Sequence, residues 1–68
     1  MSDIGSKIIA ERKAKGILQK DLAKILGVSQ SMISSYEQNK KQPGYDILIQ
    51  IADFFDVTTD YLLGRNDI

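Results

Sequence analysis

The segment that decides the fold is Gln19–Tyr36, QKDLAKILGVSQSMISSY. Its apolar residues recur at helical spacing in two short runs, and only a few residues around Gly27 separate these runs. Two short helices joined so tightly have to cross at a steep angle and pack closely. Ala23 is small enough to allow that approach, and Gly27 accepts the positive φ that such a turn requires. The segment therefore predicts two crossed helices over about residues 19–38, the second over about 29–38.

The starts and the inner faces of these two helices support the same prediction. Ser29 has the side chain of a good N-cap, whereas Leu18 precedes the first helix at a place where Ser, Thr or Asp is expected. The first helix should therefore start less stably than a capped one, by ~1 kcal/mol. The apolar residues that should face a common core are Leu22, Leu26, Val28, Ile33 and Tyr36. Together these features are typical of a helix-turn-helix motif.

Periodicity and stop signals predict three further helices around this pair. They should span about residues 4–15, about residues 45–55, and a short segment from Thr58 or Thr59 to Leu63. Gly16 and Gly64 should end the first and the last of them, and Pro43 separates the second from the pair. No segment alternates with period two for long enough to predict a strand. We expect an all-α fold that occupies residues 1–68 as one domain.

The composition argues against an enzyme. The 68 residues include no cysteine and no histidine, which removes disulfides, the commonest metal ligands and the usual general base near neutral pH. Asp53, Asp56 and Asp60 are near enough in sequence to pair as carboxylates, but their positions favour helix-end charge and capping. No nucleophile–base pair or phosphate-binding loop is present. We therefore expect no catalytic residue, no metal and no cofactor.

Nothing in the sequence indicates a membrane. Apolar runs are no longer than three residues, and the first residues lack the charged and apolar regions of a signal peptide. These features predict a cytoplasmic protein without a membrane partner. No small-molecule ligand follows from the sequence.

The charge is unevenly distributed although the formal net charge is zero. Residues 1–45 carry eight basic and four acidic side chains, whereas residues 46–68 carry one basic and five acidic side chains. A basic front and an acidic back can orient a small protein on a polyanion. Chance asymmetry in a short helical chain would produce the same pattern, so charge alone does not identify a nucleic-acid partner.

The chain resembles a known family in three stretches and an intervening proline. These are LAKILGVS at residues 22–29, ISSYE at residues 33–37, Pro43 after a basic loop, and IADFFDVTTDYLLG at residues 51–64. The pattern is similar to the Cro and phage-repressor type (Xre-like) of helix-turn-helix transcriptional regulator, from Ile4 to Gly64. The resemblance implies a compact five-helix, lambda-repressor-like domain that binds specific double-stranded operator DNA as a homodimer and acts as a repressor.

The resemblance also implies site residues. Four polar residues of the recognition helix should contact bases: Gln30, Ser31, Ser34 and Ser35. Gln30 is the most informative of them, because a glutamine amide pairs with N6 and N7 of adenine. Five residues at the flanks of the motif should contact phosphates: Gln19, Gln38, Asn39, Lys40 and Lys41. Each is otherwise interpreted as an ordinary exposed polar side chain.

Arg12 and Glu37 should form a structural pair, as the corresponding residues do in similar proteins, and tether the recognition helix to the first helix. The sequence departs from the family pattern at two places, which weakens the assignment of the family's site residues to this chain. Leu18 replaces the usual threonine cap, and the recognition helix has no basic residue between Ser29 and Gln38. We therefore expect low non-specific affinity for DNA and a strong dependence on dimerisation.

The zero net charge and the uncharged recognition helix keep a second function open. The same fold serves as a protein-interaction module, antitoxin-like or anti-repressor, and would then expose an apolar patch beyond its core. The candidates for that patch are Tyr45, Phe54, Leu63 and Ile68. The same residues would equally suit a homodimer interface, so the sequence does not separate the two.

Overall fold

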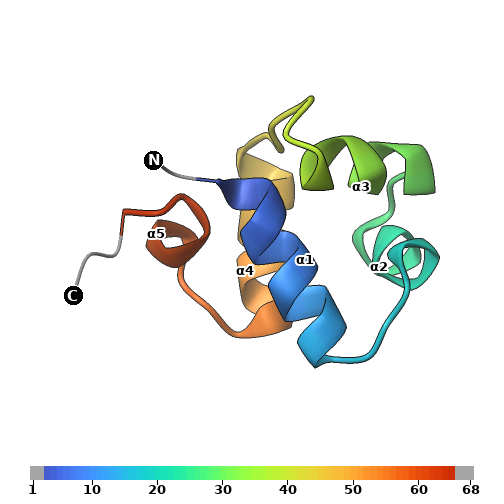
Figure 1. Ribbon diagram of the computed structural model, residues 1–68, viewed down its shortest axis with the longest axis horizontal. Coiled ribbons are helices and arrows are strands. Elements are labelled where there is room, and N and C mark those ends of the chain that lie inside the picture. The colour runs from blue at the N-terminus through green and yellow to red at the C-terminus, as the bar shows by residue number, and fades with distance from the viewer. Residues whose placement is uncertain (1–2, 66–68) are drawn as a thin grey trace.

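The computed structural model describes residues 3–65, and within that range it contains five helices and no strand. The helices are α1 (Ile4–Ala14), α2 (Gln19–Leu26), α3 (Gln30–Glu37), α4 (Tyr45–Phe55) and α5 (Thr59–Leu62). The all-α prediction is confirmed. The helix-turn-helix pair consists of α2 and α3, which lie at one end of the molecule, while α5 lies at the other end (Figure 1).

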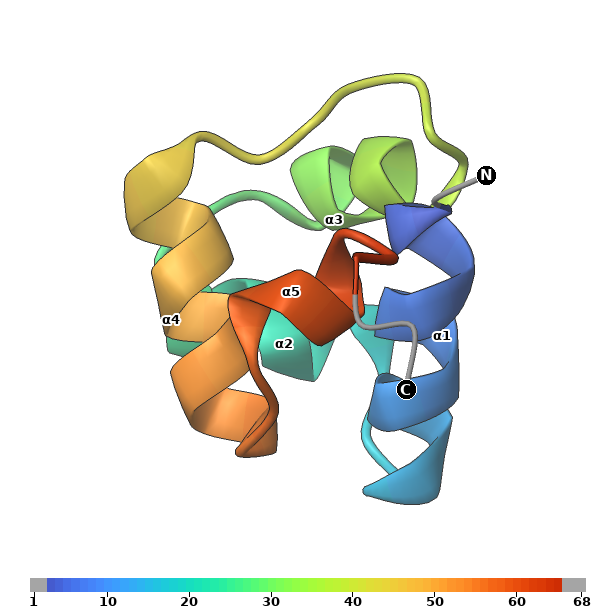
Figure 2. The same ribbon diagram turned by 90° about the vertical axis from the view of Figure 1, so that its left-hand side faces the viewer.

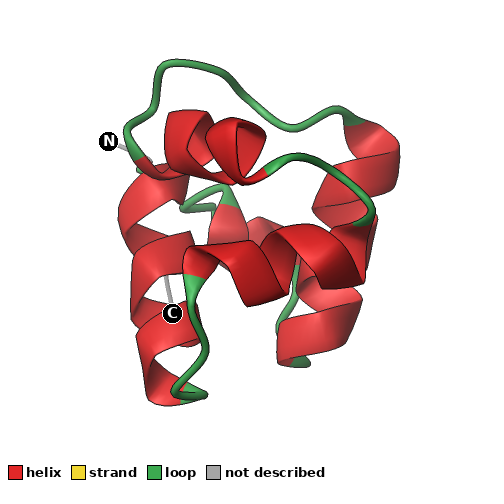
Figure 3. Cartoon of the chain, turned by 90° about the vertical axis from the view of Figure 1, so that its right-hand side faces the viewer, coloured by secondary structure: helices red, strands yellow, loops and turns green. Residues whose placement is uncertain are grey.

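The pair is framed by two longer helices. Seen from its own side, it lies between α1 and α4, with α3 above α2 (Figure 3). The loop after α3 passes near the start of α1 and then arches across the molecule to reach α4 (Figure 2). None of the helices between residues 3 and 65 has the length and apolar character needed to cross a membrane.

One core joins all five helices. Its fully buried side chains come one from each helix in chain order: Ile8, Leu22, Ile33, Ile51 and Leu62. Each contributes ~1.5–3 kcal/mol by leaving water. Ala23 of α2 is also buried, and α2 packs against α3. All five helices, α3 included, pack on this one core.

The turn of the motif follows the sequence prediction. Gly27 has φ +73° and ends α2, and the Ser29 hydroxyl accepts a hydrogen bond of 3.1 Å from the Met32 N–H to start α3. Leu18 provides no side-chain cap for α2, as expected. The Asp21 carboxylate instead accepts the Leu18 backbone N–H at 3.0 Å. This reciprocal bond supplies half of a capping box and offsets part of the missing cap.

The exposed apolar residues differ from those predicted. Phe54 and Leu63 are partly buried and pack against the core, so they do not form an open patch, and Ile68 lies outside the described residues. Tyr45 is 85% exposed, as the patch requires. Ile49 follows it by one turn of α4 and is 51% exposed. The sequence analysis did not include Ile49 among the exposed apolar residues. Phe54 is covered because its ring lies 5.0 Å from that of Phe55.

Candidate nucleic-acid interface

The four predicted base-contacting residues share the outer face of α3. Gln30 and Ser31 are exposed, and Ser34 and Ser35 follow them one turn later, half-buried. The opposite face is buried through Ile33, Tyr36 and Glu37. The outer face thus presents one amide and three hydroxyls, all short enough to approach another surface closely.

The last turn of α3 is hydrogen-bonded to the residues that follow it. Ser34 accepts a hydrogen bond of 2.7 Å from the Gln38 side chain, so these two groups form a local unit. The backbone carbonyl of Ser35 accepts the N–H groups of Lys40 and Lys41, at 2.9 and 3.4 Å. The exposed lysine pair therefore begins from a backbone that is fixed to the last turn of α3.

Arg12 and Glu37 lie in contact beneath α3. The Arg12 Nε and Nη2 atoms donate to the two carboxylate oxygens of Glu37, at 2.7 and 3.3 Å. The side chains are only 12% and 4% exposed, and Arg12 also donates to the Ile17 carbonyl at 2.9 Å. Separating the two side chains would leave a buried charge without its partner, which is costly. The pair therefore holds α1 and α3 in one relative orientation.

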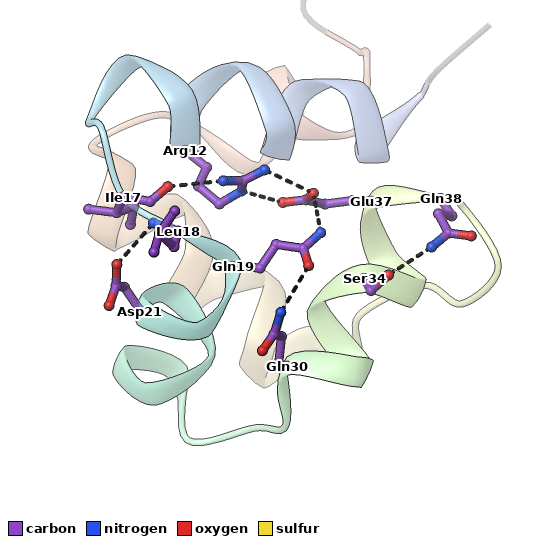
Figure 4. Close-up of polar contacts among 9 residues, drawn as sticks. All are labelled: Arg12, Ile17, Leu18, Gln19, Asp21, Gln30, Ser34, Glu37 and Gln38. Atoms are coloured by element: carbon purple, nitrogen blue, oxygen red, sulfur yellow. Dashed lines mark hydrogen bonds and ion pairs between the residues drawn. The ribbon is translucent and has the colours of Figure 1, made fainter.

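A chain of hydrogen bonds extends from this ion pair to the first residue of α3 (Figure 4). Gln19 donates its Nε2 to Glu37 at 2.9 Å, which leaves its Oε1 directed toward α3. That oxygen accepts a long hydrogen bond of 3.5 Å from Gln30 Nε2. The carboxylate can only accept, so it sets the orientation of the first amide, and the first amide sets that of the second.

The Asn39 side chain forms hydrogen bonds with the start of α1. Its Oδ1 accepts the Gly5 N–H at 3.0 Å, and its Nδ2 donates to Asp3 at 2.6 Å. This bond, together with the Ser6 N–H, lowers the pKa of the Asp3 carboxyl, because both donors favour the charged form. The side chain predicted to contact DNA is thus engaged with the start of α1.

Gly5 is a residue of this region that sequence reasoning missed. A Cβ atom placed there would lie 2.4 Å from the Glu37 carbonyl oxygen, so only glycine allows α1 to approach α3 this closely. A glycine in the first turn of a predicted helix was the available signal, since glycine weakens helices and needs a reason to be there.

The lysines have two kinds of environment. Lys40 and Lys41 are exposed beside α3. Lys7 and Lys15 instead lie over the rings of Tyr61 and Phe54, at 5.6 and 5.3 Å from the ring centres. The exposed carboxylates of the second half of the chain lie on α4 and on or beside α5: Asp46, Asp53, Asp56 and Asp60.

Comparison with known proteins relates this geometry to one family. The helix-turn-helix family profile matches residues 8–62. The repressor protein C2 of Salmonella phage P22 is 35% identical over 60 residues, which are 88% of this chain and 28% of the relative. The regulator ImmR of Bacillus subtilis is 31% identical over 65 residues, 96% of this chain and 51% of the relative. The chain spans about half the length of the first curated relatives it matches.

Two solved structures share the fold. The P22 c2 repressor in complex with a synthetic operator superposes with a TM-score of 0.90 at 32% identity, over 97% of this chain and 100% of that one. The N-terminal DNA-binding domain of SinR from Bacillus subtilis gives a TM-score of 0.80 at 36% identity, over 88% of each chain.

Proposed function

The chain belongs to the helix-turn-helix family of DNA-binding transcriptional regulators, which are not enzymes, and we propose that it recognises a specific two-fold operator as a homodimer. The observation that carries this proposal is the outer face of α3, a row of short polar side chains on a helix whose other face is anchored. Helices of this motif lie in the major groove, where their first residues contact base edges. We assign that position to α3.

Gln30 is the residue to which we assign the sharpest base contact. One of the two hydrogens on its Nε2 is directed to Gln19, which leaves the second hydrogen and Oε1 for a ligand. A donor and an acceptor side by side match N7 and N6 of adenine. The ion pair behind Gln19 supports this assignment, because it holds the amide of Gln19 in one orientation. Ser31, Ser34 and Ser35 would discriminate less, with one hydroxyl each.

We assign the phosphate contacts to groups on both flanks of α3. Lys40 and Lys41 supply the positive charge on one flank, with Gln38 beside them. On the other flank Gln19 would contribute the second hydrogen of its Nε2 and the backbone N–H in the first turn of α2. Contacts of this kind position the protein without reading the sequence.

Dimerisation would supply the affinity that one domain lacks. The net charge is zero and α3 has no basic residue, so the non-specific attraction to DNA is weak. Two copies on half-sites ~10 base pairs apart would place two α3 helices in successive turns of the major groove. The assignment as a repressor rests on the similarity to the P22 repressor, and relatives of similar identity include a transcriptional activator, BcrR of Enterococcus faecalis. We propose the cytoplasm as the location from the sequence features given above.

The alternative function is a protein-interaction module. Tyr45 and Ile49 favour it, because they are exposed on one side of α4 and belong to neither the core nor the α3 face. The same two residues would serve a homodimer. The two functions differ in one measurable respect, which is whether the chain selects a DNA sequence.

Selection of binding sites from a random duplex pool, followed by sequencing, tests the proposal. We expect an enriched inverted repeat with half-sites ~10 base pairs apart. A single enriched half-site would contradict the dimer but retain sequence recognition. No enrichment at low salt with folded protein would contradict DNA recognition and favour the interaction module.

A further inference from the structure

Three residues join the start of α1 to the end of α3, and we call them the clasp: Asp3, Gly5 and Asn39. The Asn39 side chain uses both of its polar groups, accepting from the Gly5 N–H at 3.0 Å and donating to the Asp3 carboxylate at 2.6 Å. The same carboxylate oxygen caps α1 by accepting the Ser6 N–H at 3.1 Å. One asparagine thus satisfies an N-terminal donor of α1 and binds the residue that caps it.

The backbone of the clasp requires particular residue types. Asn39 has φ +61°, a left-handed conformation that asparagine tolerates better than most other residues with a side chain. Gly5 has no Cβ, and its backbone lies against the Tyr36 and Glu37 carbonyls. The clasp therefore depends on a tight contact between residues that are 34 positions apart in the chain.

The clasp lies directly before the basic loop. Lys40 follows Asn39, and the N–H groups of Lys40 and Lys41 both donate to the Ser35 carbonyl. The backbone of the lysine pair is therefore held on one side by the last turn of α3 and on the other by a side chain attached to α1. The Arg12–Glu37 ion pair joins α1 to α3 a second time, two residues before the clasp.

We propose that Asn39 is a positioning residue of the DNA-binding surface, which acts through the clasp to set the path of the Lys40–Lys41 backbone. This inference rests on the proposed function, because the lysines matter only if they meet phosphates. It adds a second role to the phosphate contact expected of Asn39. The clasp uses one of the two hydrogens on the Asn39 Nδ2, and a surface that is fixed before binding loses less conformational entropy on binding.

Two single variants and their combination test the proposal. N39G keeps the positive φ and removes both side-chain hydrogen bonds, and D3A removes the partner on α1. We expect each to weaken binding to a random-sequence 30-base-pair duplex at low salt by ~2- to 10-fold, the range of a lost hydrogen bond. The double variant should be little weaker than either single variant, because both changes open the same clasp.

The sign of the D3A effect separates positioning from electrostatics. Removing a negative charge near DNA by itself strengthens binding, so a loss of affinity in D3A cannot come from charge. D3N is the matched control, because its amide oxygen still accepts from Ser6 and Asn39, and it should bind at least as well as the unaltered chain. Unaltered or tighter binding by D3A with weaker binding by N39G would overturn the proposal, and so would additive losses in the double variant.

A measurement without DNA distinguishes the clasp from the proposed function. Protection of the Gly5 amide against hydrogen exchange should fall in N39G, and the amide resonances of Lys40 and Lys41 should shift, while urea unfolding confirms that the variants are folded. Unchanged Gly5 protection would overturn the clasp itself. If the unaltered chain binds no duplex, the proposed function and the positioning role both fail, whereas the exchange result still decides whether the clasp exists.

Discussion

The two ends of α3 have opposite environments. At its start, Gln30 and Ser31 are exposed, and Gln30 makes only a long hydrogen bond of 3.5 Å. At its end, Tyr36 and Glu37 are buried, and Glu37 forms a 2.7 Å ion pair with Arg12. A single helix of eight residues is thus open to a ligand at one end and anchored to the scaffold at the other.

This difference separates two demands on a recognition surface. The side chains that contact a ligand have to be accessible. Other residues, which do not contact the ligand, have to hold those side chains in position. Substitutions at the start of α3 should therefore change DNA binding and leave stability almost unaltered. Substitutions at the end should reduce stability first.

The largest expected effect is that of Arg12→Met, which leaves the Glu37 carboxylate buried with the Gln19 amide as its remaining side-chain partner. Breaking one side of a buried ion pair costs ~3–5 kcal/mol of unfolding free energy, most of what a domain of this size has. Urea unfolding measures it. The matched control is the double variant R12M/E37M, which should recover much of the loss because no charge stays buried. A loss below ~1 kcal/mol in R12M would mean that the pair does not anchor α3.

Gly5→Ala tests the anchored end without changing any charge. The added methyl group would meet the Glu37 carbonyl at 2.4 Å, so α1 and α3 have to separate. We expect a loss of ~1–3 kcal/mol of unfolding free energy, as for other overpacked sites. Gly44→Ser is the control, since a Cβ there meets nothing within 4 Å and serine suits the N-cap of α4. Equal stability of the two variants would contradict the close approach.

Gln30→Ala tests the open end. Unfolding free energy should change by less than ~0.5 kcal/mol, because the side chain is exposed. Binding to the selected operator should weaken by ~1–3 kcal/mol, with relaxed preference at one base position and little change on random DNA. Binding titrations on both duplexes measure this. An equal loss on both would show that Gln30 does not read a base.

The open end was more predictable from sequence than the anchored end. The bounds of α4 agree with the predicted range of about residues 45–55, and the Ser29 cap and the Gly27 turn lie where local signals placed them. Such features depend on residues within a few positions of one another. Exposure of Gln30 and Ser31 likewise follows from helical periodicity.

The anchored end depends on contacts between distant residues. Asn39 was assigned to phosphate contacts from the family resemblance, and its hydrogen-bond partners in the structure, which the sequence did not indicate, are 34 and 36 residues away. Local patterns do not contain that information. Gly5 was missed for the same reason, since its neighbour is the end of another helix. The Arg12–Glu37 contact was expected only through the family resemblance, as no local pattern joins residues 25 positions apart.

Lys41→Ala should have a smaller effect than Gln30→Ala and of a different kind. A lysine that neutralises one phosphate contributes to all duplexes alike, and its loss should lower the slope of log affinity against log salt by ~0.9. Binding at several salt concentrations measures this on operator and random DNA. Lys15→Ala is the control, because Lys15 lies over Phe54 at the other side of the molecule. The same slope for both variants would remove Lys41 from the phosphate contacts.

The smallest expected effect is in the acid titration of Asp3. The Asn39 hydrogen bond, followed by the Ser6 N–H and then by Lys7, lowers the pKa of this exposed carboxyl in the folded chain. Because the folded-state pKa is below the unfolded value, about 3.9, Asp3 stabilises the fold above that pH, and the contribution is lost as the pH falls through the folded value. NMR titration of the carboxyl carbon in N39G should show a pKa moved up toward the ordinary value, while Q30A, an uncharged change at the opposite end of α3 from Asn39, should leave it unchanged. An unaltered Asp3 pKa in N39G would mean that the end of α3 is not joined to Asp3 in solution, and that Arg12 and Glu37 alone anchor it.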